Sequence, residues 1–187
     1  MSQGFIGVAE KLAEAIGVVE VEPLHLANMF AAGSMAEIQP GYGLCDFGNP
    51  STKVFILISG TIEVSKPDVT GVMRPIAQVQ GPAMIGHMGV IDGSLRSATC
   101  KVAGEVPAAI ISLSADVFKR LLVRPDATGS AVRHLVLANL IRQLGNTNIT
   151  VAALLDGMSD QEAATQTGTQ PVQDITENDL HMLQAVL

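Results

Sequence analysis

Apolar residues recur at helical intervals near both ends of the sequence. They do so over residues 5–16, and again over residues 23–30, where a proline opens the segment. The pattern returns after Ser114, a residue suited to a helix N-cap, over residues 115–122, and Pro125 begins a longer segment. We therefore expect helices on both sides of a central region.

The central region, residues 36–114, has a different pattern. Short runs rich in β-formers are separated by Gly, Pro, Asn or Asp, and no segment of helix length lies between them. The absence of such segments excludes a βαβ arrangement, and the spacing predicts an antiparallel sandwich or barrel. The runs cover residues 54–58, 61–64, 72–79, 98–102 and 109–113.

The longer C-terminal segment carries a heptad pattern. The a and d positions of three heptads are Leu137, Leu140, Leu144, Val151, Leu154 and Met158, with Thr147 as the one polar entry. Such a stripe serves either as the seam of a two-helix dimer, which we favour, or as a face packed on the same chain. Gly145 weakens both readings because a glycine inside a helix costs about 1 kcal/mol relative to Ala, and GNTN at 145–148 could instead form a turn.

Composition and charge narrow the function. The chain of 187 residues is 48% hydrophobic and 16% charged, which indicates a folded domain, and its net charge of −7 argues against DNA as a direct partner. It has only Cys45 and Cys100, no secretory leader pattern and no apolar run of membrane-spanning length. We expect a cytoplasmic protein without disulfides or a membrane segment.

The end of the sequence is acidic. Beyond Arg142 there is no Lys or Arg, and six acidic residues follow. Residues 159–174 are typical of a flexible linker, and residues 175–187 predict an amphipathic helix capped by Thr176. This helix, from Ile175 to Leu187, either engages an unknown protein partner or packs permanently on the barrel.

Catalytic motifs are missing from the sequence, which has no HExxH, CxxC or GxSxG pattern, so we expect no enzyme, resident cofactor or metal site. One segment, GPAMIGHMGVIDGSLRSATC at 81–100, combines glycine-containing turns with Arg96 and Ser97. Backbone N–H groups in such turns, together with one guanidinium and one hydroxyl, suit a single phosphate. The alternative is a surface loop capped by Arg96.

The sequence resembles a known family, the cyclic nucleotide-binding domains of the catabolite activator protein and its relatives. The resemblance covers about residues 24–158. It rests on GYGLCDFGNPSTKVFILISGTIEVS after Pro40, on IGHMGVIDGSLRSAT, which is similar to the family's phosphate cassette, and on IRQLGNTNITVAALLD, which looks like its dimer helix. It implies an α+β fold, an antiparallel β-jelly-roll (a double-stranded β-helix) flanked by N-terminal helices and a long C-terminal dimerisation helix.

The resemblance also implies roles for residues of the cassette. Arg96 and Ser97, followed by Ala98 in the family's R-S/T-A pattern, would hold the cyclic phosphate. Gly86 and Met88 would border the ribose and phosphate.

Other implied positions surround the base. Ile76 would line its pocket, and Thr147 and Asn148 would hydrogen-bond it, one from each subunit of a dimer. His87 stands where the family has a glutamate that accepts the ribose 2′-OH, and Gln143 stands where the activator has an arginine. These two departures put affinity and the choice of nucleotide in question.

We therefore expect a homodimeric sensor that binds a cyclic nucleotide, with cAMP favoured, and acts through protein contacts because too little sequence remains for a helix-turn-helix domain. One alternative is a scaffold that has lost its ligand; a haem sensor that uses His87 as iron ligand is another. The expected organisation is a helical segment (1–34), the jelly-roll (35–124), the dimerisation helix (125–158), the linker (159–174) and the terminal helix (175–187).

Overall fold

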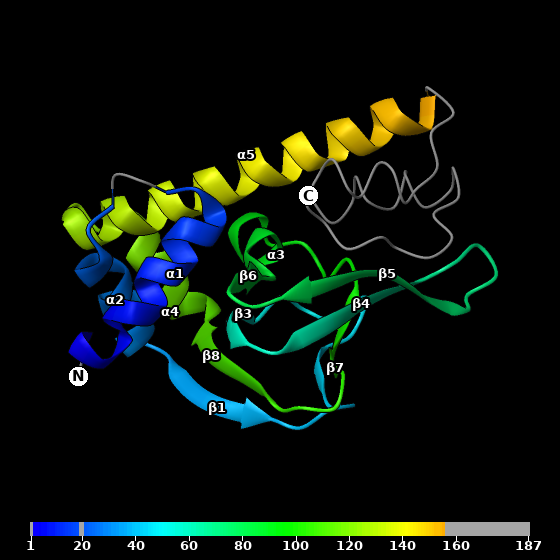
Figure 1. The fold of residues 1–187 in the computed structure, drawn as a ribbon, viewed down its shortest axis with the longest axis horizontal. Helices are drawn as coiled ribbons and strands as arrows, with labels where there is room; N and C mark the ends of the chain where they lie inside the picture. The colour runs from blue at the N-terminus through cyan, green and yellow to red at the C-terminus, as the bar shows by residue number, and fades with distance from the viewer. Residues whose placement is uncertain (1, 19–20, 156–187) are drawn as a thin grey trace.

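The computed structural model of the chain describes residues 2–18 and 21–155 (Figure 1). The predicted linker at 159–174, the terminal helix at 175–187 and the heptad residue Met158 lie outside these residues.

The N-terminal helices form where the sequence predicts them. A short 3-10 turn, η1 (Ser2–Phe5), leads into α1 (Ile6–Ile16), and α2 (Pro23–Ala31) follows. Gly17 ends α1 in the left-handed conformation (φ 84°), where a residue with a Cβ would be strained. A proline in the first turn of α2 suits that position because its missing N–H would have no helical partner.

The central region is a jelly-roll of eight antiparallel strands in two four-stranded sheets (Figure 1). One sheet has the order β1-β8-β3-β6 and the other the order β2-β7-β4-β5. The sandwich predicted from the sequence is therefore confirmed, and the fold is α+β. The strands are β1 (Ser34–Ile38), β2 (Gly43–Cys45), β3 (Lys53–Ser59), β4 (Thr61–Pro67), β5 (Met73–Gln80), β6 (Ala83–Ile85), β7 (Thr99–Ala103) and β8 (Ala108–Ser114).

The two sheets enclose an apolar interior, to which both contribute. Phe55 and Leu57 of β3 and Ile110 of β8 pack with Ile62 of β4 and Val102 of β7. β3 and β8 are also buried on their other face, where the helices cover them. Burial on both faces explains why β3 is almost continuously apolar.

Three further helices lie within the described residues. A short helix, α3 (His87–Asp92), lies between β6 and β7, α4 (Ala115–Val123) follows β8, and α5 (Ala127–Leu155) is the longest. Ser114 caps α4 as predicted, since its hydroxyl accepts a hydrogen bond from the Val117 N–H. The 29 residues of α5 correspond to about 44 Å and run unbroken through Gly145, which excludes the alternative of a turn at GNTN.

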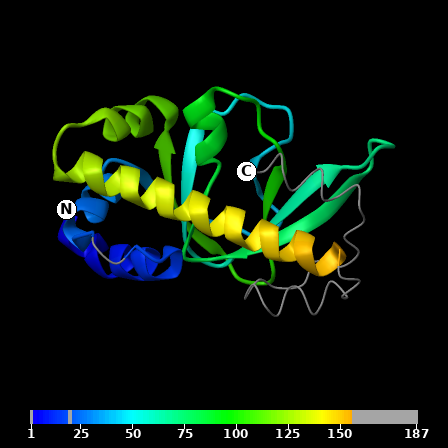
Figure 2. The same cartoon turned by 90° about the horizontal axis from the view of Figure 1, so that it is seen from above.

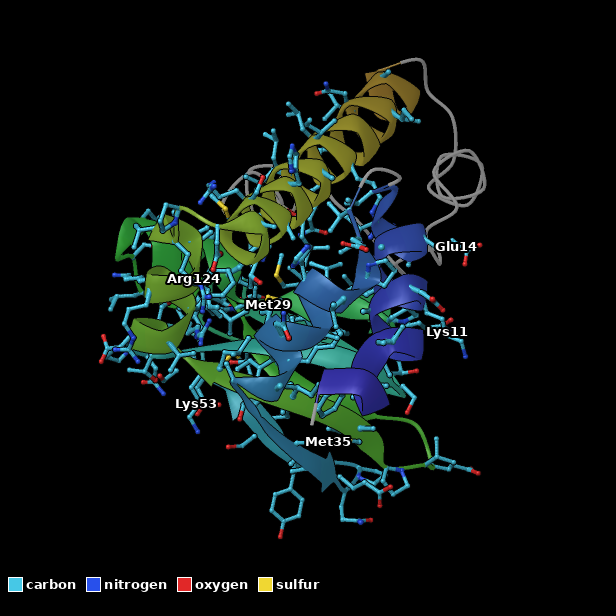
Figure 3. All side chains as sticks on the ribbon, turned by 90° about the vertical axis from the view of Figure 1, so that its left-hand side faces the viewer. Lys11, Glu14, Met29, Met35, Lys53 and Arg124 are labelled. Atoms are coloured by element: carbon cyan, nitrogen blue, oxygen red, sulfur yellow. The ribbon has the colours of Figure 1, made fainter. Side chains whose placement is uncertain are left out.

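The helices form a layer against the outer face of β3 and β8. α1, α2, α4 and the first half of α5 share one apolar core with Val54, Ile56, Ile111 and Leu113 of these strands. Figure 3 shows Lys11 and Glu14 pointing away from α1 into solvent, whereas Met29 lies inside the layer and is fully buried. Among residues 2–18 and 21–155, no helix is both long and apolar enough to span a membrane.

The second half of α5 extends away from this layer and passes over the jelly-roll (Figure 2). Its apolar side chains Leu137, Ile141 and Leu144 are 55%, 63% and 54% exposed. Leu140, which the heptad analysis assigned to the seam, instead packs against the core of its own chain. The exposed row thus uses Ile141 in place of Leu140.

Candidate functional site

The guanidinium of Arg96 is the centre of the candidate site. Its loop, between α3 and β7, is fixed by backbone hydrogen bonds from the Arg96 N–H to the Asn49 carbonyl (2.8 Å) and from the Gly48 N–H to the Arg96 carbonyl (2.9 Å). The side chain is only 6% exposed because the loop turns it inward. A charged group is thereby placed inside the protein.

Two backbone carbonyls and one aromatic ring hold this guanidinium. Nη1 donates to the Gly86 carbonyl at 2.9 Å, and Nη2 donates to the Lys53 carbonyl. The Arg96 Cζ lies 5.7 Å from the centre of the Phe55 ring, within the range of a cation–π contact. The third nitrogen, Nε, is buried, and its N–H has no hydrogen-bond partner in the described part of the chain.

No carboxylate balances this charge among residues 2–18 and 21–155, where the ion pairs are His25–Glu22, Arg74–Asp68 and Arg124–Asp126. Carbonyl oxygens supply partial charge only, and a buried charge without a counter-ion is costly. An anion beside Arg96 would remove that cost and use the unpaired Nε–H. The arrangement is therefore chemically suited to one small anionic group.

Gly86 makes the position of the guanidinium possible. Its backbone is left-handed (φ 74°), and a Cβ added there would lie 2.1 Å from the Arg96 Nη1. Any side chain at position 86 would thus occupy the place of the guanidinium as well as strain the backbone.

His87, the next residue, contacts the long helix. Its side chain is 2% exposed, and Nε2 lies 3.2 Å from the amide nitrogen of Asn139 on α5, which is itself 2% exposed. Burial lowers the pKa of His87 to about 4, so the ring is neutral near pH 7. As Asn139 donates to Nε2, the ring proton is on Nδ1, which has no partner among the described residues.

The other cassette residues lie around this centre. Ser97 is half-buried beside Arg96, and Met88 is half-buried in the first turn of α3. Ala98 and Ile76 are buried in the apolar interior that also contains Phe55. Of the residues predicted for the phosphate, the structure brings Arg96 and Gly86 into direct contact.

The predicted residues on α5 lie further along that helix. The Thr147 hydroxyl donates to the Gln143 carbonyl of its own helix at 3.0 Å, and Asn148 is exposed. The Gln143 side-chain oxygen is buried without a partner in the described structure. Within that structure no hydrogen bond joins these three side chains to the cassette, and the bond between the cassette and α5 is that of His87 with Asn139.

Sequence reasoning overlooked Asn139 and Phe55. The one signal for Asn139 was its position as a lone polar side chain in the apolar stretch LVLANLI. Phe55 looked like any core residue of β3, because only the fold brings the Arg96 side chain to its ring.

Comparisons with known proteins agree with this geometry. Residues 36–124 match the family described as cyclic nucleotide-binding domain. Among solved structures, a cyclic nucleotide-binding domain from Methylobacillus flagellatus is similar with a TM-score of 0.64 and 19% identity, over 91% of this chain and 89% of that one. No curated protein sequence matches this chain.

Two more structures show the same fold. The N-terminal domain of a transcriptional regulator from Streptomyces coelicolor has a TM-score of 0.54 and 22% identity, over 78% of this chain and 93% of that one. The catabolite activator protein of Thermus thermophilus has a TM-score of 0.54 and 15% identity, over 90% of this chain and 83% of that one. Residues 36–124 thus match the cyclic nucleotide-binding domain family, and the chain has a fold similar to that of the Thermus thermophilus catabolite activator protein.

Proposed function

We propose that this protein is a homodimeric sensor of a cyclic nucleotide, with cAMP as the favoured ligand, that signals through protein contacts rather than by binding DNA. The observation that supports this function is the buried Arg96 guanidinium, which has no counter-ion among residues 2–18 and 21–155. A cyclic phosphate carries one negative charge and can accept from the unpaired Nε–H. The Ser97 hydroxyl, next in sequence, is a second donor for the same group.

The peptide between Gly86 and His87 would transmit the effect of ligand binding from Arg96 to α5. Arg96 binds the carbonyl of Gly86, and the following residue, His87, binds Asn139 of α5. An anion that draws the guanidinium away from the Gly86 carbonyl breaks a hydrogen bond of Gly86. Gly86 directly precedes His87, the residue that contacts α5. The ligand shifts the position of α5 only to the extent that it binds the two arrangements with different affinity.

Dimerisation is supported by the exposed apolar row of α5. Leu137, Ile141 and Leu144 lie along one side of a helix and are each more than half exposed. A second copy of α5 would cover them in a two-helix seam and remove their apolar surface from water. The partner helix would also bring a second copy of Thr147 and Asn148 to the seam.

A scaffold without a ligand is the second candidate function. Two observations favour it: the Arg96 guanidinium already donates to two carbonyls, and the Nε2 of His87 is already occupied by Asn139. Under this hypothesis, the buried charge is a structural clamp between β3 and the cassette.

Calorimetric titration distinguishes the two functions. Purified full-length protein is titrated with cAMP, with cGMP and a cyclic dinucleotide as comparisons. A receptor binds cAMP saturably at one site per chain, and Arg96→Ala weakens binding by about 2–5 kcal/mol, at least about 30-fold. Arg96→Lys keeps the charge but loses the forked donors and should also bind weakly.

The matched control is Arg120→Ala, which removes an exposed arginine of α4. It should bind cAMP like the unmodified protein, and thermal melts show whether each variant is folded. Absence of heat with every nucleotide, from folded protein, would contradict the sensor function and support the scaffold.

A further inference from the structure

The two cysteines of the chain face each other across neighbouring strands of the jelly-roll. β2 and β7 are antiparallel, and Cys45 pairs with Cys100 next to a register shift between Gly43 and Cys45. Both side chains belong to the interior cluster between the sheets. Opposed residues of antiparallel strands have Cα atoms about 4.5–5.5 Å apart, and a disulfide accepts about 4.4–6.8 Å. These two ranges overlap, so we expect the Cα atoms of Cys45 and Cys100 to lie within reach of a disulfide.

The two thiols differ in accessibility and acidity. Cys45 is partly exposed, whereas Cys100 is 5% exposed. A hydrogen bond from the Cys100 thiol, opposed by burial and assisted by the charge of Arg96, lowers the pKa of Cys45 to about 7. The same hydrogen bond and burial raise the pKa of Cys100. Cys45 is therefore the more reactive sulfur and Cys100 the sheltered one.

We propose that Cys45 and Cys100 form a redox-active dithiol, which a hydroperoxide converts into an intramolecular disulfide. The Cys45 thiolate attacks the peroxide: an S–O bond forms, the O–O bond breaks, and the leaving oxygen takes a proton and departs as an alcohol or water. Cys45 is oxidised to a sulfenic acid and the peroxide is reduced. The Cys100 sulfur then attacks Cys45, an S–S bond forms, the S–O bond breaks, and hydroxide leaves as water with the proton of Cys100.

The dithiol lies beside the candidate anion site. The Cys45 sulfur is 3.9 Å from the carbonyl of Ala98, two residues beyond Arg96, and the charge of Arg96 acts on the Cys45 thiolate. An anion at Arg96 would offset that charge, so a bound cyclic nucleotide should slow the oxidation of Cys45. This last consequence rests on the proposed function, whereas the disulfide itself does not.

The test uses the reduced full-length protein and hydrogen peroxide, with free thiols and intact mass followed over time. We expect both thiols to be lost together with two hydrogens of mass, and digestion to give one peptide pair that joins Cys45 to Cys100. In Cys100→Ser, the intermediate should persist as a sulfenic acid on Cys45 that dimedone traps. In Cys45→Ser, Cys100 should remain a free thiol under the same treatment.

Two results would overturn the proposal: both thiols persisting in folded protein exposed to peroxide, or a disulfide that forms only between chains and appears as a dimer on a non-reducing gel. A further arm repeats the oxidation with cAMP. If the disulfide forms at the same rate with cAMP and calorimetry detects no binding, the proposed function fails while the dithiol stands.

Discussion

The substitution Gly86→Ala tests the site most directly, because it inserts one methyl group at its centre. The added Cβ would lie 2.1 Å from Nη1 and 3.1 Å from Cζ of Arg96. The end of an arginine side chain can move, so we expect the guanidinium to leave this position rather than the backbone to shift. Its departure breaks the hydrogen bond from Nη1 to the Gly86 carbonyl.

The expected loss in the free energy of unfolding of Gly86→Ala has two parts. Alanine in the left-handed conformation costs about 1–2 kcal/mol. Loss of a hydrogen bond to a charged donor costs about 1.5–3 kcal/mol more. The sum, roughly 2.5–5 kcal/mol in the free energy of unfolding, corresponds to a Tm lower by roughly 5–20 °C for a chain of this size. Cyclic nucleotide binding should be lost as well, because the phosphate would no longer meet the guanidinium.

Gly93 supplies the matched control, since it ends the same short helix with φ 79° and has nothing within 4 Å of an added Cβ. Gly93→Ala should show only the backbone strain, about 1–2 kcal/mol, and should bind nucleotide normally. Urea unfolding and calorimetry measure both effects. In an Arg96→Ala background, Gly86→Ala should cost no more than Gly93→Ala. Equal losses at positions 86 and 93 in the protein that retains Arg96 would refute the reasoning.

Three further predictions concern the dimer, the buried histidine and a helix cap. Leu144→Glu should raise the dimer dissociation constant at least roughly 100-fold, because an apolar side chain is lost from each subunit. Val123→Glu, at an exposed apolar position on α4, should leave that constant unchanged. Sedimentation equilibrium measures the dissociation constant of both variants. The pKa of His87 is about 4 in the folded protein against 6.5 in a free chain, so the unfolded state binds more protons between these pH values. The free energy of unfolding should therefore fall by about 2 kcal/mol from pH 7 to pH 5. Urea unfolding at both pH values should show most of this loss disappear in His87→Gln and persist in the exposed-site control His134→Gln. Ser114→Ala should lower the free energy of unfolding by about 1 kcal/mol through loss of the cap of α4, measurable by the same method.

The sequence predicted those helices and strands in which apolar residues follow a clear pattern. β3, β8 and the helices α1, α4 and α5 all have clear apolar patterns, and each appears close to its predicted bounds. It did not resolve β1, where four of five residues are exposed, or the three-residue strands β2 and β6. These strands are held by pairing with neighbours distant in sequence, which leaves no local signal.

The candidate site also has one part that the sequence predicted and another that it did not. Arg96 and Gly86 were identified from a local motif and do meet in the structure. The contact of His87 with Asn139 joins residues 52 positions apart, and the opposition of Cys45 and Cys100 depends on strand register. Neither relation is encoded by local spacing, so only the three-dimensional fold could reveal them.

Local charge around Arg96 favours a ligand with a single negative charge. The protein as a whole carries −7, but repulsion from exposed charges is screened beyond about 8 Å at physiological salt. Within residues 81–100, the one acidic side chain, Asp92, is exposed and accepts a hydrogen bond from the Ser94 N–H of its own loop. His87 is neutral, so the positive charge of this segment is that of Arg96, which has no carboxylate in ion-pair contact within residues 2–18 and 21–155. A cyclic phosphodiester neutralises that charge, whereas a nucleoside triphosphate would leave several negative charges without partners in a low-dielectric interior, and we expect the site to discriminate against it.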